Sequence, residues 1–105
     1  RGLSLQASTD NLQFMITQAL QAQAQVLLLG MQVPPNYGAD YTRQFSGMYA
    51  ALAQKNKIRL VPFFLKGLAD VADSARWFQS DRIHPNEAAQ AKLLDNVWAE
   101  LKPLL

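Results

Sequence analysis

Cysteine is absent from this chain of 105 residues, and long apolar runs are absent too. The lack of cysteine excludes disulfide bonds and thiolate metal sites, but it leaves the redox compartment undetermined. No apolar stretch approaches the roughly 20 residues that a membrane-spanning helix needs, so we expect no transmembrane segment. A single histidine and scattered carboxylates match no metal-ligand spacing, and there is no glycine-rich phosphate loop. We therefore expect neither a metal ion nor a cofactor.

Charge is scarce as well. Only 17% of the residues are charged, and the formal net charge is +2. The basic residues are scattered and form no run interleaved with aromatics, which argues against a nucleic-acid partner. Half of the residues are apolar, as in globular proteins, and this length allows at most one ordinary domain. The chain opens on Arg1 rather than methionine, so we expect this end to be a cut or processed end.

The hydrophobic pattern alternates between helix and strand. Residues 9–24 and 40–54 have apolar residues at helical spacing and are expected to be amphipathic helices. Their inward positions would be Leu12, Met15, Ile16, Ala19 and Leu20 in the first helix, and Phe45, Met48, Tyr49 and Leu52 in the second. The first helix would be capped by Ser8, Thr9 or Asp10. Residues 25–30 and 58–62 are short continuous apolar runs, typical of parallel strands buried on both faces.

The rest of the chain is expected to be loops and one more helix. Residues 31–38 carry prolines and glycine and should form a loop, residues 63–72 a short helix or lid-like segment, and residues 73–81 an irregular stretch. The last helix should run from Pro85 to about residue 101, because proline suits the first helical position. Its core face would consist of Ala88, Ala91, Leu94, Val97 and Leu101. Two strands make a poor independent sheet, so further strands should come from a missing N-terminal part or from association between chains, of which we favour the missing part.

The only histidine follows an acid by three residues, in the segment Ser80-Asp81-Arg82-Ile83-His84-Pro85-Asn86. This spacing lets the carboxylate accept one ring N–H and leaves the other ring nitrogen free, as in the acid and base of a nucleophilic triad. At a helix N-cap the helix dipole would disfavour the imidazolium form of His84, whereas Asp81 would stabilise it. The alternative interpretation is a turn aspartate and a surface or capping histidine without a chemical role.

A nucleophile to complete the triad is not evident. None of the serines lies in a strand–turn–helix elbow: Ser4, Ser8, Ser46, Ser74 and Ser80. Those before or within helices are expected to cap or to face solvent, and nothing near the loop serines would activate them. The sequence thus contains an acid and a base without the group that attacks.

Two segments resemble the SGNH (GDSL-type) hydrolases, in particular the bacterial thioesterase I/lysophospholipase L1/arylesterase branch. One is Leu-Leu-Gly-Met-Gln-Val-Pro-Pro-Asn-Tyr-Gly over residues 28–38, followed by Tyr41 and Phe45-Ser46, and the other is Asp-Arg-Ile-His-Pro-Asn over residues 81–86. The similarity continues, in the same order, through Val61-Pro62-Phe63-Phe64-Leu65 and at Trp98, Leu101, Pro103 and Leu104. The resemblance covers essentially the whole chain.

The resemblance implies an α/β fold. Residues 1–105 would be the C-terminal portion of a single SGNH hydrolase domain, a three-layer α/β/α flavodoxin-like fold with parallel strands whose N-terminal strands are missing. Asp81 and His84 match the acid and base of the family's triad. The residues matched to the border of the acyl-binding groove are Val33, Pro34, Asn36 and Tyr37, with Phe64 as a further lining residue. The alternatives are a rigid connecting loop in which Tyr37 packs inward, and a core position for Phe64.

The family's Gly-Asp-Ser serine and its oxyanion glycine and asparagine lie upstream of the matched region and do not occur here. Arg1-Gly2-Leu3 resembles the stretch that follows the asparagine block. The resemblance implies a serine esterase, thioesterase or lysophospholipase acting on acyl esters or thioesters, active only when this chain is joined to its N-terminal part. It also implies a periplasmic or secreted bacterial protein. The alternative is a non-catalytic α/β module or relic that associates, with itself or a partner, through its unpaired sheet edge.

Overall fold

The computed structural model describes residues 4–105. Residues 1–3, which carry the expected cut end and the resemblance to the stretch after the asparagine block, lie outside the described residues. The helices and strands follow one another as α1 (Leu5–Gln21), β1 (Leu27–Leu29), α2 (Ala39–Asn56), β2 (Arg59–Val61) and α3 (Gln90–Leu101). Short 3-10 turns lie between and after them: η1 (Pro35–Tyr37), η2 (Ser74–Trp77), η3 (Glu87–Ala89) and η4 (Lys102–Leu104).

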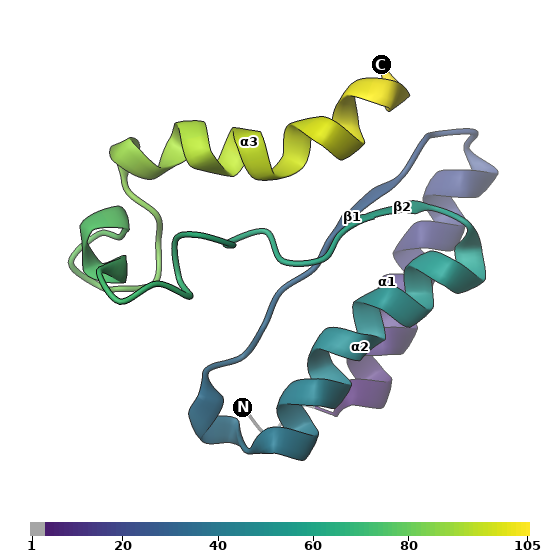
Figure 1. Cartoon of the computed structure of the whole chain (residues 1–105). Coiled ribbons are helices and arrows are strands. Elements are labelled where there is room, and N and C mark those ends of the chain that lie inside the picture. Colours follow the sequence, from purple (N-terminus) through teal and green to yellow (C-terminus); the bar gives the residue numbers. More distant parts are fainter. Residues whose placement is uncertain (1–3) are drawn as a thin grey trace.

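The two strands form a parallel pair in which Leu28 lies opposite Leu60. Helix α2 connects the strands and contacts both of them, α1 packs on α2, and α3 lies on the other side of the strands (Figure 1). The expected α/β class with parallel strands is therefore confirmed, with helices on both faces of the strand pair. Both strands are shorter than the apolar runs suggested, because only three residues of each pair.

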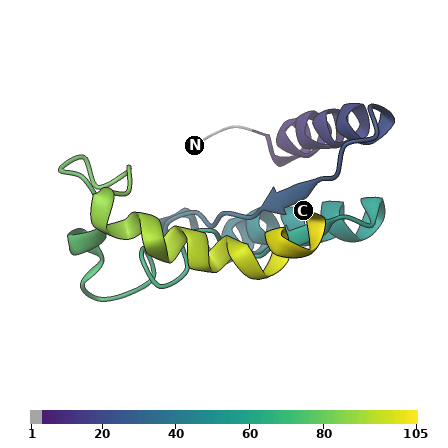
Figure 2. The ribbon, with the colours of Figure 1, turned by 90° about the horizontal axis from the view of Figure 1, so that it is seen from above.

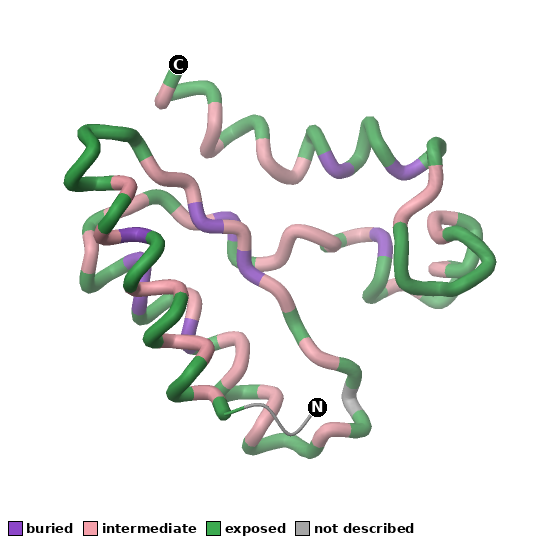
Figure 3. Tube along the Cα trace, turned by 180° about the vertical axis from the view of Figure 1, so that it is seen from behind, coloured by how far each residue is buried: buried purple, intermediate pink, exposed green. Residues whose placement is uncertain are grey.

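One core cluster joins the strands to α1 and α2. Ile16, Leu28, Met48 and Leu52 are buried there, and Leu12 and Tyr49 are packed against them. Figure 3 shows the buried positions on the strands and on the facing sides of these helices. The inward faces expected for the two helices are confirmed at these positions. The expectation is wrong for Met15, which is 56% exposed, and for Leu20, which is 39% exposed, because α1 fully buries only the position of Ile16.

Helix α1 begins earlier than its apolar stripe. The side chain of Ser4 caps it by accepting a hydrogen bond from the backbone N–H of Ala7 at 3.1 Å, so the expected caps at residues 8–10 are wrong. The cause is that Leu5, Gln6 and Ala7 are good helix formers, which extend the helix by one turn beyond the expected start. The capping bond therefore locates the start of α1, whereas the hydrophobic periodicity of the sequence does not.

A second core cluster lies beneath the turns after β2. Leu68, Ala89 and Leu93 are buried there, with Phe64, Leu65, Trp77 and Phe78 packed against them. Residues 63–72 form turns rather than the expected short helix. Gly67 adopts a positive φ of 79°, and its N–H donates to the Asp70 carboxylate at 2.7 Å, a local bond that competes with helix formation.

The last helix differs most from expectation. Regular α-helix begins at Gln90, the cap is Asn86, and Pro85 forms an antiparallel bridge with Phe78 instead of opening the helix. His84 is consequently not the N-cap. The face turned to the core carries Ala89 and Leu93, whereas the expected core residues Ala88, Ala91 and Leu94 are exposed. This helix has two apolar stripes, and the second core cluster buries residues of only one of them.

The molecule is thin, with extents of 41 × 34 × 18 Å (Figure 2). Its accessible surface is 7366 Å², against about 5,900 Å² for a compact protein of 11.7 kDa. Its radius of gyration is 14.8 Å, against about 13 Å for a compact domain of this length. Within residues 4–105, β1 has a partner strand on one edge only. No helix in that range is long and apolar enough to cross a membrane.

Candidate active site

Asp81 and His84, here called the dyad, lie at the tip of a narrow backbone ribbon between η2 and η3. The ribbon is held by a hydrogen bond from the N–H of Gln79 to the carbonyl of His84 at 2.7 Å, and by one from the N–H of Asn86 to the carbonyl of Trp77 at 2.9 Å. A tight turn closes the tip, since the N–H of Arg82 donates to the carbonyl of Gln79 at 2.8 Å. Residues 79–84 are called the dyad turn below.

The Asp81 carboxylate makes contacts through both oxygens. Its Oδ1 accepts from the backbone N–H groups of Ile83 at 2.9 Å and His84 at 3.1 Å, and its Oδ2 lies 2.5 Å from Nδ1 of His84. Because an ionised carboxylate only accepts hydrogen bonds, Nδ1 of His84 carries the proton. Arg82 takes a left-handed conformation with φ 60°, which folds the chain tightly enough for one carboxylate to reach all three groups.

Hydrogen bonds lower the pKa of Asp81 from its ordinary value of 3.8 to about 2; the bond from His84 contributes most, followed by the two backbone N–H groups. The carboxylate is therefore ionised at neutral pH. The His84 side chain is 69% exposed, and its Nε2 is the ring nitrogen that Asp81 does not engage. An oriented imidazole with an accessible Nε2 can act as a general base toward a group brought to it.

None of the serines is an evident partner of the dyad, although Ser80 directly precedes Asp81 in the dyad turn. Ser4 caps α1, and the Ser46 hydroxyl donates to the carbonyls of Thr42 and Arg43 within α2. Ser74 opens η2 and lies in a small hollow of about 190 Å³ beside Arg82 and Ile83. In the described part of the chain no serine hydroxyl is a hydrogen-bond partner of the imidazole.

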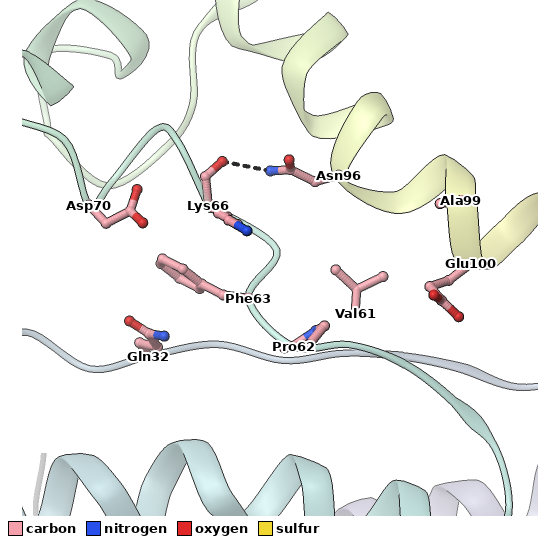
Figure 4. A pocket seen from close by; sticks show the side chains of 9 residues that line it. All are labelled: Gln32, Val61, Pro62, Phe63, Lys66, Asp70, Asn96, Ala99 and Glu100. Carbon is pink, nitrogen blue, oxygen red and sulfur yellow. Dashed lines mark hydrogen bonds between the residues drawn. The ribbon is translucent and has the colours of Figure 1, made fainter.

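A cavity beside the end of β2 does not contain the dyad. It has a volume of about 490 Å³ and lies between the end of β2 and α3, where Val61 and Phe63 face Asn96 and Ala99 (Figure 4). The Asn96 amide donates to the carbonyls of Phe64 at 2.9 Å and Lys66 at 2.8 Å and so fixes one wall. Neither Asp81 nor His84 is among the described residues that line it.

The residues expected to bind substrate lie on two separate parts of the structure. Val33 and Pro34 precede η1, whereas Asn36 and Tyr37 lie within it. The Tyr37 ring stacks on Tyr41 with centroids 5.7 Å apart, opening an aromatic row that continues along α2 through Phe45 and Tyr49. Phe64 packs against the second core cluster instead. None of these five is among the described residues that line the cavity between β2 and α3.

Sequence reasoning missed two residues that hold the dyad turn, Gln79 and Asn86. The Gln79 side chain donates to the carbonyl of Pro85 at 3.3 Å, and the Asn86 side chain bonds to both η2 and η3. An asparagine just before a helix is a cap signal, but its bonds to η2 depend on tertiary structure. No group of three potential metal ligands occurs in residues 4–105.

Comparison with known proteins gives consistent matches over the whole chain. It is 49% identical over 105 residues to an esterase, TesA, of Pseudomonas aeruginosa, covering 100% of this chain and 51% of that protein. It is 34% identical over 105 residues to thioesterase 1/protease 1/lysophospholipase L1 of Escherichia coli, covering 49% of that protein. The chain thus spans about half the length of the curated relatives it matches. No protein-family model matches it.

Solved structures agree. The crystal structure of TesA superposes with a TM-score of 0.89 at 48% identity, covering 100% of this chain and 57% of that chain. AlinE4, an SGNH-hydrolase family esterase, superposes with a TM-score of 0.70 at 35% identity, covering 100% of this chain and 54% of that chain. The resemblance to SGNH hydrolases predicted from the sequence is therefore confirmed, with this chain matching the C-terminal portion of such proteins.

Proposed function

We propose that this chain, matched over its whole length by part of several SGNH-type esterases, is the C-terminal portion of a single SGNH hydrolase domain and supplies the acid and base of a catalytic triad. The substrates are acyl esters or thioesters, including lysophospholipids, in line with the names of the relatives. The observation that carries the proposal is the bond between Asp81 and Nδ1 of His84, which leaves Nε2 accessible.

The mechanism follows from that geometry. Nε2 of His84 removes the proton of a serine hydroxyl as the hydroxyl attacks the acyl carbonyl, and it returns the proton to the leaving group. Asp81 remains ionised, holds the ring with Nδ1–H directed away from the serine, and stabilises the imidazolium. The serine and the oxyanion donors come from the N-terminal part of the enzyme, because this sequence has no Gly-Asp-Ser block. Water then releases the acyl group.

The substrate groove is proposed at the η1 side of the molecule. Val33, Pro34, Asn36 and Tyr37 would border the acyl chain, with Phe64 on the side of the second core cluster. Support comes from the partly exposed aromatic row that begins at Tyr37 and Tyr41. The isolated chain is expected to be inactive, since an acid and base without nucleophile and oxyanion donors give little acceleration. Export to a bacterial periplasm or medium is proposed too, and fractionation of the native host would test it.

The test is a substitution in the complete hydrolase. His84→Ala should lower kcat for a short-chain ester by about 10²- to 10⁴-fold, because the general base is lost. Asp73→Asn is the matched control, since Asp73 is an exposed acid paired with Arg76 at 3.1 Å, outside the dyad. Near-normal hydrolysis by the His84 variant would refute the proposed base. A Gly-Asp-Ser block absent from the rest of the gene would refute the family mechanism.

A second candidate is a non-catalytic module that associates through exposed apolar surface. It is favoured by exposed apolar surface: within residues 4–105 β1 has a partner strand on one edge only, and Leu94 and Trp98 are 55% and 42% exposed. Such a module would form a stable homodimer in size-exclusion chromatography. It would also fail to hydrolyse esters when an N-terminal SGNH half is added, whereas the hydrolase proposal expects activity to appear.

A further inference from the structure

Asn86 lies where three backbone segments meet. Its side-chain amide donates to the carbonyl of Arg76 at 2.8 Å and to that of Phe78 at 3.4 Å. Its side-chain oxygen accepts from the N–H of Ala89 at 3.2 Å, which caps the helical segment leading into α3. The backbone N–H of Asn86 donates to the carbonyl of Trp77 at 2.9 Å. One half-buried residue thus joins the dyad ribbon, η2 and the last helix.

The orientation of this amide is set by its neighbours. The side-chain nitrogen of Asn86 faces two carbonyl oxygens, which can only accept hydrogen bonds. Its side-chain oxygen faces a backbone N–H, which can only donate one. An asparagine satisfies both ends, whereas an aspartate or serine offers the oxygen for the cap without a pair of donors for the carbonyls. Capping alone therefore does not account for asparagine at this position.

The hydrogen bonds of Asn86 connect different parts of the structure from those that join Asp81 to His84. Asp81 and His84 bind each other within the dyad turn, and Asn86 contacts neither side chain. What Asn86 fixes is the base of the ribbon against the second core cluster, to which Trp77, Phe78 and Ala89 belong. The exposed imidazole has little packing of its own, so its place in the molecule depends on how the ribbon is anchored.

We propose that Asn86 is a positioning residue for the hydrolase reaction. It holds the dyad turn at a fixed place relative to the start of α3, so that Nε2 of His84 meets a nucleophile carried by another part of the enzyme. The inference rests on the proposed function and adds to it a residue that touches no reacting atom. A displacement of about 1 Å of a catalytic group can cost on the order of 100-fold in rate, so such an anchor matters.

The experiment compares two variants in the complete hydrolase. Asn86→Asp keeps the oxygen that caps the helix and replaces the amide donors with a carboxylate oxygen facing two carbonyls. It should lower kcat by about 10- to 100-fold while KM changes little, because acyl binding lies elsewhere. Amide hydrogen exchange at Gln79, whose N–H bridges the ribbon to His84, should become faster. The control is Gln90→Ala, which removes only a side-chain bond to the carbonyl of Asn86 and should leave kcat unchanged.

Several outcomes separate this inference from the proposed function. If His84→Ala abolishes hydrolysis but Asn86→Asp stays within twofold of the parent in kcat, the positioning role is wrong and the hydrolase proposal stands. If His84→Ala leaves hydrolysis intact, the proposed function itself fails. Asn86→Ser, which keeps a cap oxygen without the added charge, guards against a folding defect. If both Asn86 variants lose helical circular dichroism, the residue merely maintains the helix and the inference is overturned.

Discussion

At the scale of single residues, Asp81 links backbone conformation to chemistry. One of its oxygens closes the turn through two backbone N–H groups, and the other orients His84. The spacing of the acid and the histidine was enough to predict this contact. It was not enough to predict the left-handed Arg82 between them or the anchoring by Asn86, because those features depend on where η2 packs.

The lowered pKa of Asp81 predicts a pH dependence of stability. The folded-state pKa of about 2 lies below the ordinary 3.8, so the ionised carboxylate favours the folded state. This contribution is complete above the ordinary pKa and is lost as pH falls from about 4 towards 2. Urea unfolding of the chain between pH 2 and 6 should show it as a stability difference from Asp81→Asn that shrinks over that interval. A difference that is constant across the whole range would contradict the assignment.

Gly30 and Gly47 offer a matched pair of glycine-to-alanine substitutions. A Cβ at Gly30 would lie 2.3 Å from the carbonyl oxygen of Pro62, whereas a Cβ at Gly47, in α2, would meet nothing within 4 Å. Gly30→Ala should therefore lower the free energy of unfolding by about 1–3 kcal/mol, because the chain after β1 must move away from the chain after β2. Gly47→Ala should raise it by about 0.5–1 kcal/mol, as alanine is the better helix former. Chemical denaturation of both variants checks the pair, and equal effects would refute the close approach.

At the scale of elements, the sequence predicted the parallel strand pair and the helices that cover it, since those segments have one clear apolar pattern each. It failed for α3, which has two apolar stripes. Leu94 belonged to the stripe expected to be buried, yet it is 55% exposed, while Leu93 is buried. Hydrophobic periodicity shows that a helix has an apolar side, but tertiary packing decides which of two such sides is buried.

Neighbouring leucines on α3 test this assignment. Leu93→Ala should destabilise the chain by about 2–4 kcal/mol, because it leaves a cavity beside Leu68 and Ala89 in the second core cluster. Leu94→Ala removes the same atoms from an exposed position and should change the stability of the isolated chain by less than about 0.5 kcal/mol. Thermal or urea unfolding measures both. A larger loss for Leu94→Ala would mean that the buried face of α3 is misassigned.

At the scale of the whole molecule, several separate observations support the proposal that this chain is part of a larger domain. The surface is larger than that of a compact protein of the same mass, β1 has a free edge within residues 4–105, and the relatives are about twice as long. An apolar strand edge and an exposed apolar helix stripe are features that folded proteins normally cover. The sequence predicted the uncovered sheet, but the exposed apolar stripe of α3 became evident only in the structure.

We therefore expect the hydrolase to be reconstituted from two pieces. This chain alone should show no ester hydrolysis, and adding the N-terminal half of the same enzyme should restore it, with half-maximal activity at a definite concentration of the added piece. Trp98→Asp should raise that concentration at least tenfold, because it places a charge on the exposed stripe of α3 that the other half would cover. Lys57→Asp is the control, since Lys57 is exposed at the left-handed end of α2. If hydrolysis appears without the added half, or if both variants behave alike, this surface does not bind the missing half.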